Sequence, residues 1–213
     1  MKRIAAVLLA VLALVLAGCS SSSSGAPKPK PSELLPKNAA GPYQGAGLDP
    51  AQPRPSFTLT DTAGKSFAFG TITSGHPTFL YFGYTNCPDI CPETMADIGI
   101  ALSKVSPAIA AKTYVVFVTT DVKRDTGPVI ATWLSHMPGH DKGHWVGLRG
   151  TQAQIDAAQA AAHIAVATDD GETHSAQALL YGPDDYARVT FLQSANEQQA
   201  MEHDLPIVAK QTS

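Results

Sequence analysis

The segment from Thr78 to Thr119 constrains the fold more than any other part of the sequence. Residues 78–84 form a continuous apolar and aromatic run, which is typical of a strand buried on both faces. Residues 114–119 form a second such run, rich in valine. Between them, apolar residues recur at steps of three and four from Met95 to Ile109, which is one face of a helix. A strand, a helix and a strand at this spacing predict a right-handed βαβ crossover with two parallel strands.

The remaining elements extend this unit into one domain. Residues 56–61 and 66–69 alternate apolar and polar side chains around a Gly-containing turn and predict an N-terminal β-hairpin. Thr151 and Gln154 form a potential capping box for an alanine-rich helix that runs to about Ile164. Further elements are expected at 128–136 (helix), 145–148 (a short strand), 176–181 and 188–192 (strands around a turn) and from Asn196 onward (helix). This pattern predicts an α/β, thioredoxin-like fold with a central mixed sheet flanked by helices.

The N-terminus predicts export and a lipid anchor. Lys2 and Arg3 precede an apolar run from Ile4 to Ala17, which is short for a permanent membrane span and typical of a signal peptide. The run ends in Leu-Ala-Gly-Cys19, which resembles the lipobox of bacterial lipoproteins. By that resemblance, residues 1–18 are removed and the Cys19 sulfur carries diacylglycerol. We therefore expect an extracytoplasmic protein, held by lipid at the outer face of the bacterial cytoplasmic membrane.

Composition separates a stalk from a domain. Residues 19–55 are rich in Ser, Pro and Gly without apolar periodicity, which predicts an extended stalk. Residues 56–213 are enough for one core and too few for two typical domains. Removal of residues 1–18 lowers the net charge from −3 to −5. A mildly acidic chain with scattered charges is no candidate for nucleic-acid binding.

Two cysteines carry the chemistry of the domain. With Cys19 assigned to the anchor, only Cys87 and Cys91 remain, and both lie where the strand at 78–84 meets the following helix. The carboxyl end of a central strand is a usual ligand site, and the first turn of a helix favours an anion, so we expect lowered thiol pKa values. Such a pair can close a disulfide or bind a soft metal ion. The three intervening residues leave room for an ion and do not forbid a disulfide.

Three ordered motifs resemble the Sco/SenC family of copper proteins. Residues 81–92, YFGYTNCPDICP, resemble the family motif Y-F-G-[FY]-T-x-C-P-D-[VI]-C-P. Residues 117–126, FVTTDVKRDT, resemble F-V-[ST]-x-D-P-x-R-D-T, and residues 172–175, ETHS, resemble its D-H-S. Val122 and Thr173 depart from the family pattern, which has proline and aspartate there. Neither departure falls on a ligand position.

The resemblance implies that Cys87, Cys91 and His174 bind one copper ion per domain. Two thiolates suit Cu(I) and an imidazole also suits Cu(II), so both oxidation states are expected. Asp89 and Asp121 are expected to support the site without binding the ion. The implied function is a copper metallochaperone whose client is the binuclear copper-A centre of cytochrome c oxidase subunit II. Another copper chaperone is a possible donor of the metal.

Other interpretations stay open beside this one. The two cysteines could instead cycle between dithiol and disulfide in a thiol–disulfide oxidoreductase that reduces client cysteines before metallation. A peroxide-reducing relative is a weaker alternative, because the peroxiredoxin T-x-x-C surroundings are absent. His136, His140 and His144 form a second histidine cluster, but Pro138 and Gly139 interrupt any helix there. We interpret this segment as a solvated loop.

Overall fold

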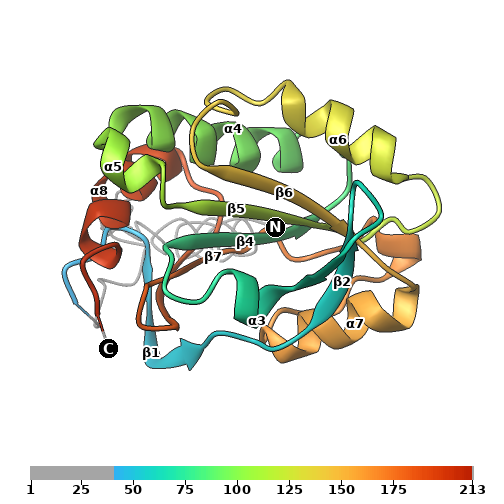
Figure 1. Ribbon diagram of the computed structural model, residues 1–213, viewed down its shortest axis with the longest axis horizontal. Helices are drawn as coiled ribbons and strands as arrows, with labels where there is room; N and C mark the ends of the chain where they lie inside the picture. Colours follow the sequence, from blue (N-terminus) through green and yellow to red (C-terminus); the bar gives the residue numbers. More distant parts are fainter. Residues whose placement is uncertain (1–40, 213) are drawn as a thin grey trace, which may run out of the picture. The chain divides into compact units, whose positions relative to one another are not determined.

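A mixed sheet of eight strands forms the centre of the domain (Figure 1). The computed structural model describes residues 41–212, which belong to one compact unit. The strand order is β1-β8-β7-β4-β5-β6-β2-β3. The strands are β1 (Ala46–Pro53), β2 (Thr58–Asp61), β3 (Ser66–Ala68), β4 (Thr78–Gly83), β5 (Tyr114–Thr119), β6 (His144–Arg149), β7 (Ala178–Tyr181) and β8 (Tyr186–Phe191).

The predicted parallel pair lies in the middle of the sheet. β4 and β5 pair in parallel from Thr78 with Tyr114 to Gly83 with Thr119, and β6 continues the parallel set beside β5. All six residues of β4 are buried, as expected for a strand that is apolar on both faces. The carboxyl ends of β4 and β5 therefore meet at one edge of the sheet, where both connecting loops begin.

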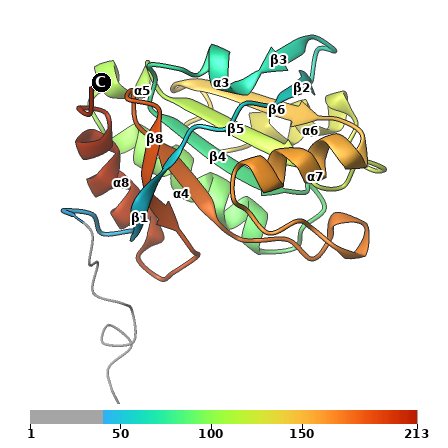
Figure 2. The same cartoon turned by 90° about the horizontal axis from the view of Figure 1, so that it is seen from below.

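Helices cover both faces of the sheet. The helices are α3 (Phe69–Ile72), α4 (Ile90–Lys104), α5 (Pro107–Ala110), α6 (Gly127–Ser135), α7 (Gln152–Ala161) and α8 (Glu197–Val208), with a 3₁₀ turn, η1, at Asp169–Gly171. Because side chains alternate along a strand, Phe79 and Tyr81 of β4 pack with α4, α6 and α8, whereas Leu80 and Phe82 pack with α3 and α7. Figure 2 shows α7 on the face opposite to α4. The core is thus divided into two layers by the sheet.

Local sequence signals are confirmed at several elements. The predicted hairpin is the antiparallel pair β2–β3, and β2 also pairs with β6. The capping box of α7 is present, with Thr151 and Gln154 bonded in both directions. The short strand expected at 145–148 is β6, and the strands expected around the turn at 182–185 are β7 and β8.

Two predicted boundaries are wrong. The stalk was expected to reach residue 55, but Ala46–Pro53 forms β1 and pairs with β8 in the sheet. The helix expected to continue to Ile109 ends at Lys104, because Ser106 is extended before Pro107 and caps a separate short helix, α5. The signal peptide, Cys19 and residues 19–40 of the stalk lie outside the described residues. No helix within residues 41–212 is long and apolar enough to cross a membrane.

Candidate metal centre

The two cysteines are placed by the end of β4 and the start of α4. Cys87 lies in the loop after β4, and its backbone N–H donates to the carbonyl of Tyr84 at 3.3 Å. The side chain of Asp89 caps α4 by accepting from the N–H of Ile90 at 2.7 Å. Cys91 follows in the first turn, where its N–H donates to the Cys87 sulfur at 3.4 Å. The helix start thus directs one backbone donor at the first sulfur.

A buried carboxylate anchors the beginning of this loop. Asp125, fully buried after β5, accepts from the Thr85 N–H at 3.0 Å and from the Thr119 hydroxyl at 2.6 Å. The Thr85 hydroxyl donates to the other oxygen of the same carboxylate. Charge-assisted bonds of this kind are about twice as strong as neutral ones. The loop that carries Cys87 is therefore fixed to the neighbouring strand.

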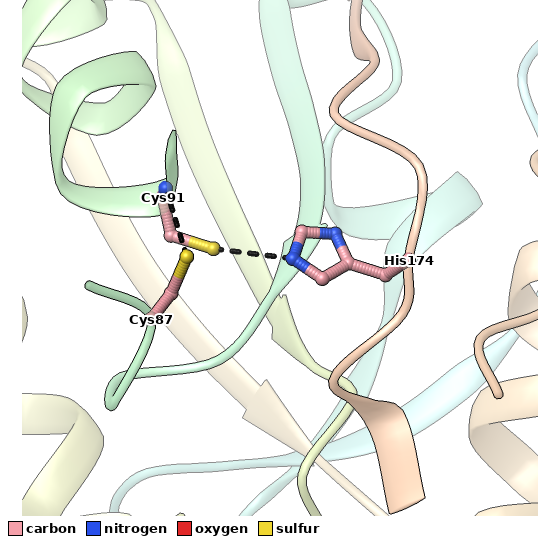
Figure 3. A group of neighbouring side chains, drawn as sticks. All are labelled: Cys87, Cys91 and His174. Carbon is pink, nitrogen blue, oxygen red and sulfur yellow. Dashed lines mark hydrogen bonds between the residues drawn. The ribbon is translucent and has the colours of Figure 1, made fainter. Parts of the chain in front are cut away.

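His174 comes from a distant part of the chain and completes a three-residue cluster (Figure 3). It lies in the connection between η1 and β7, and its Nε2 is 3.4 Å from the Cys91 sulfur. The two sulfurs and the imidazole nitrogen lie within 4.8 Å of one another. Within residues 41–212, this is the one group of three or more Cys, His, Asp or Glu side chains whose ligand atoms converge in this way.

Hydrogen bonding and burial leave His174 in the form that a metal ligand requires. Its Nδ1 lies 2.9 Å from the carbonyl of Ser175, so Nδ1 is the protonated nitrogen and Nε2 keeps its lone pair. Burial lowers the pKa of His174, against the opposing effect of the Ser175 and Phe82 carbonyls. The imidazole is therefore neutral at pH 7, with its free nitrogen directed at Cys91.

The expectation of a lowered pKa is wrong for Cys91. The side chain is fully buried, and this burial raises the pKa of the thiol to about 12. Hydrogen bonds from the Tyr84 backbone and the Tyr81 hydroxyl act in the opposite direction but are weaker. Desolvation of a thiolate outweighs the helix terminus because the apolar wall surrounds the sulfur. Binding of a metal ion at this sulfur must therefore release a proton.

Two tyrosines of the same motif form the wall of the site, and the sequence analysis did not identify them. The Tyr81 hydroxyl donates to the Cys91 sulfur at 3.6 Å. The rings of Tyr81 and Tyr84 stand edge-on to His174, with centroids at 6.2 and 5.5 Å. A hydroxyl-bearing residue inside an apolar strand was the available signal, because a buried tyrosine hydroxyl usually needs a partner.

The supporting aspartates have different positions. Asp89 is exposed and its carboxylate is the helix cap described above. Asp121 is buried and forms an ion pair with Arg124, whose guanidinium also contacts Glu172 at 2.6 Å. The structure therefore places Asp121 two contacts away from the loop of His174. That both could support the site stays a prediction.

The second histidine cluster does not converge. His136 caps the end of α6, His140 packs on Trp145 with ring centroids at 5.5 Å, and His144 begins β6. The ring of His144 stacks on Tyr114 at 4.7 Å. The rings of His140 and His144 thus serve separate local contacts, and His136 caps α6 through its backbone N–H.

The donor set at the cluster fits copper. Two thiolates are the soft ligands that Cu(I) prefers, and an imidazole suits Cu(II) as well. A structural zinc site would normally have four protein ligands, and here three converge. The chemistry of the donors, rather than the cysteine spacing alone, therefore favours a copper ion.

Comparison with known proteins gives consistent matches. A SCO2-like protein of Rickettsia felis is 33% identical over 143 residues, which is 66% of this chain and 63% of the relative. The chain spans less than two thirds of the length of the first curated relatives it matches. The structure of Bradyrhizobium japonicum ScoI with copper bound is 28% identical, with a TM-score of 0.59 over 73% of this chain and 98% of ScoI.

A more distant solved structure supports the fold alone. BsSco, described as a member of the Sco family of cytochrome c oxidase assembly proteins with a disulfide switch, is 18% identical with a TM-score of 0.62. The match covers 78% of this chain and 99% of BsSco. The predicted thioredoxin-like α/β fold is thereby confirmed. The sequence model of the SCO1/SenC family matches residues 46–208, and this chain therefore belongs to the SCO1/SenC family.

Proposed function

We propose that this protein is a membrane-anchored copper metallochaperone that delivers copper to the copper-A centre of cytochrome c oxidase subunit II. The observation that carries the proposal is the convergence of Cys87, Cys91 and His174 within 4.8 Å. The copper-bound structure of the related ScoI and the assembly role of the Sco family support it. One copper ion per domain, as Cu(I) or Cu(II), is the expected cargo.

The three ligands suit a protein that passes its metal on. Cys87 lies in the short loop between β4 and α4, and Cys91 lies in the first turn of α4, whereas His174 lies on an irregular connection. Departure of the histidine would leave the ion on two sulfurs and accessible to a sulfur of the client. Copper would then move by ligand exchange, with no net oxidation or reduction in the transfer itself.

The N-terminal segment suits the same role. Lipidation at Cys19 would hold the domain at the outer face of the cytoplasmic membrane, and the stalk would give it reach. A tether raises the effective concentration of the domain at a membrane-bound client. A Cys19→Ala variant is expected in the soluble fraction with its copper affinity unchanged. Another copper chaperone would supply the metal.

A metal titration tests the ligand set. The chain from Asn38, which forms one compact unit with its own core, is titrated with Cu(II) and followed by absorption in the thiolate-to-copper region. The wild type is expected to bind one equivalent. Separate alanine variants of Cys87, Cys91 and His174 are expected to lose that stoichiometric binding. His136→Ala, an exposed histidine outside the cluster, serves as the matched control.

A thiol–disulfide oxidoreductase is the second candidate, because the two cysteines are free thiols in close proximity. In that reaction, two electrons and two protons would pass from Cys87 and Cys91 to a client disulfide, leaving a disulfide here. His174→Ala separates the two functions in cells that lack the wild-type gene. If the oxidase still assembled with His174→Ala and failed only with the cysteine variants, the metallochaperone proposal would be wrong.

A further inference from the structure

The segment that carries His174 has little regular structure of its own. Between α7 and β7 it contains η1 and one isolated bridge, from Thr168 to Thr173. Asp169, Asp170 and Gly171 all have positive φ angles. Hydrogen bonds between Thr168 and Thr173 close this turn on itself but do not join it to the sheet. Its contacts with neighbouring elements therefore fix the position of His174.

The turn between β5 and α6 supplies those contacts. The Thr120 hydroxyl donates to the carbonyl of Gly171 at 2.8 Å. A Cβ on Gly171 would lie 2.1 Å from the Thr120 carbonyl oxygen, so only glycine permits this approach. Lys123 pairs with Asp170 at 2.8 Å, and Arg124 pairs with Glu172 at 2.6 Å. The loop therefore rests on this turn immediately before His174.

The two ion pairs differ in how they are anchored. The side chains of Lys123 and Asp170 are 68% and 75% exposed, and such a pair is worth little. Arg124 instead contacts two carboxylates, and the one at Asp121 is only 2% exposed. The planar guanidinium can serve two carboxylates at once, which an ammonium does less well. The buried carboxylate of Asp121 thus fixes Arg124 to the rest of the domain, whereas both partners in the Lys123 ion pair are exposed.

Arg124 also connects the two parts of the metal site. Its guanidinium carbon lies 6.0 Å from the centre of the Tyr84 ring, and that ring stands edge-on to His174 at 5.5 Å. Tyr84 in turn accepts the N–H of Cys87 through its carbonyl. One side chain therefore touches the cysteine loop through Tyr84 and the histidine loop through Glu172.

We propose that Arg124 is a positioning residue that holds His174 beside the two cysteines by joining Glu172 to the buried carboxylate of Asp121. This inference rests on the proposed copper site, and it extends that site to a residue that is no ligand. Loss of the Arg124 contact would leave all three ligands in the chain but would release the loop of the third. Supporting residues of this kind typically change metal affinity by about 10- to 100-fold.

The contacts of Arg124 with Asp121 and Glu172 are called the clamp below. Two disruptive variants and one matched control test it. Arg124→Met removes the clamp but leaves Asp121 buried without its partner, so it could also reduce folding. Glu172→Gln weakens the contact between Arg124 and residue 172. The side chain of Glu172 is 53% exposed, so this variant leaves no buried charge unpaired. Lys123→Met removes the neighbouring charge, which forms the more exposed ion pair with the same loop. All are made in the chain from Asn38.

Two measurements keep this proposal separate from the proposed function. In the metal-free protein, Arg124→Met and Glu172→Gln are expected to raise amide hydrogen exchange in residues 168–175. Glu172→Gln, which keeps the contact of Arg124 with Tyr84, is expected to leave residues 85–91 unchanged. In the Cu(II) titration, both are expected to bind about tenfold more weakly, with thiolate absorption kept and imidazole nitrogen coupling reduced in the electron paramagnetic resonance spectrum. Lys123→Met should stay within about twofold of the wild type in affinity. Arg124→Lys, which keeps the charge, should recover part of the loss.

Opposite results would overturn the clamp. If folded Glu172→Gln showed wild-type exchange and wild-type affinity, Arg124 would not position His174. Equal losses with Lys123→Met and Arg124→Met would indicate a general effect of surface charge instead. If the wild type bound no copper, the proposed function would fail, and hydrogen exchange in the metal-free protein would still decide whether the clamp exists.

Discussion

The two halves of the candidate site are built in different ways. The cysteine half, residues 83–91, joins a fully buried strand to a capped helix and is fixed by the buried Asp125. The histidine half, residues 168–175, is an irregular segment fixed by ion pairs that are partly exposed. Opening the first half would disturb the core, whereas the second can move without unfolding the domain. A site with two ligands fixed by the core and a third fixed by ion pairs at the surface is suited to releasing an ion.

Gly83→Ala is expected to give the largest loss of stability, because it acts inside the cysteine half. A Cβ at this position would lie 2.8 Å from both the Cys91 sulfur and the ring of Tyr81. Overpacking of this kind costs about 2 kcal/mol. Urea denaturation should show this decrease in the free energy of unfolding, together with weaker copper binding. Unchanged stability would mean that the cysteine half is less rigid than its burial indicates.

Glu197→Gln tests the support of the cysteine half by α8, which packs against α4. Glu197 is 2% exposed, and burial raises its pKa to about 7. Between pH 4.5 and 7 the folded protein therefore holds a proton that the unfolded chain has released, so stability falls as the pH rises. Glu197→Gln should abolish this slope and raise the free energy of unfolding at pH 8 by about 1 kcal/mol.

Denaturation at pH 5 and pH 8 measures that effect. Glu202→Gln on the same helix is the control and should retain the wild-type slope. Hydrogen exchange in the histidine half should not follow the ionisation of Glu197, because the acidic neighbours of this group, Asp97 and Glu93, lie on α4. A pH response confined to residues 168–175 would contradict the contrast between the halves.

Gly171→Ala is expected to have the smallest effect on global stability, although its local clash is severe. The residue has φ of 94°, and its Cβ would meet the Thr120 carbonyl. Because local detachment of the histidine half can relieve the clash, the loss in the free energy of global unfolding is limited to the cost of that detachment and should be less than about 1 kcal/mol. Hydrogen exchange in residues 168–175 should rise, and copper should bind more weakly.

A control for Gly171→Ala exists in the β2–β3 turn. Gly64 also has a positive φ, of 82°, but a Cβ there meets nothing within 4 Å. Gly64→Ala therefore strains the backbone without creating a steric clash. Strands β5 and β6 separate the β2–β3 turn from β4, which leads to the site. It should leave copper affinity unchanged. A loss of global stability with Gly171→Ala as large as with Gly83→Ala would remove the distinction between the two halves.

Much of the cysteine half could be predicted from the sequence, because its determinants are local. Residues 78–91 contain an apolar strand, a capped helix start and two cysteines four residues apart. The break of the helix before Pro107 was also present in the sequence, but the apolar spacing continued through it to Ile109. Periodicity there competed with the restriction that proline imposes on the preceding residue.

The sequence by itself determined the βαβ unit, the hairpin and the cysteine pair, and its resemblance to the family motifs implied that His174 joins that pair. Only the tertiary structure decided that residues 46–53 form an edge strand, that burial raises the pKa of Cys91, and that Arg124 joins Asp121 to Glu172. The reason is physical. Backbone propensities and apolar periodicity act between near neighbours, whereas desolvation, strand pairing and a salt bridge across 48 residues exist only when distant segments have come together.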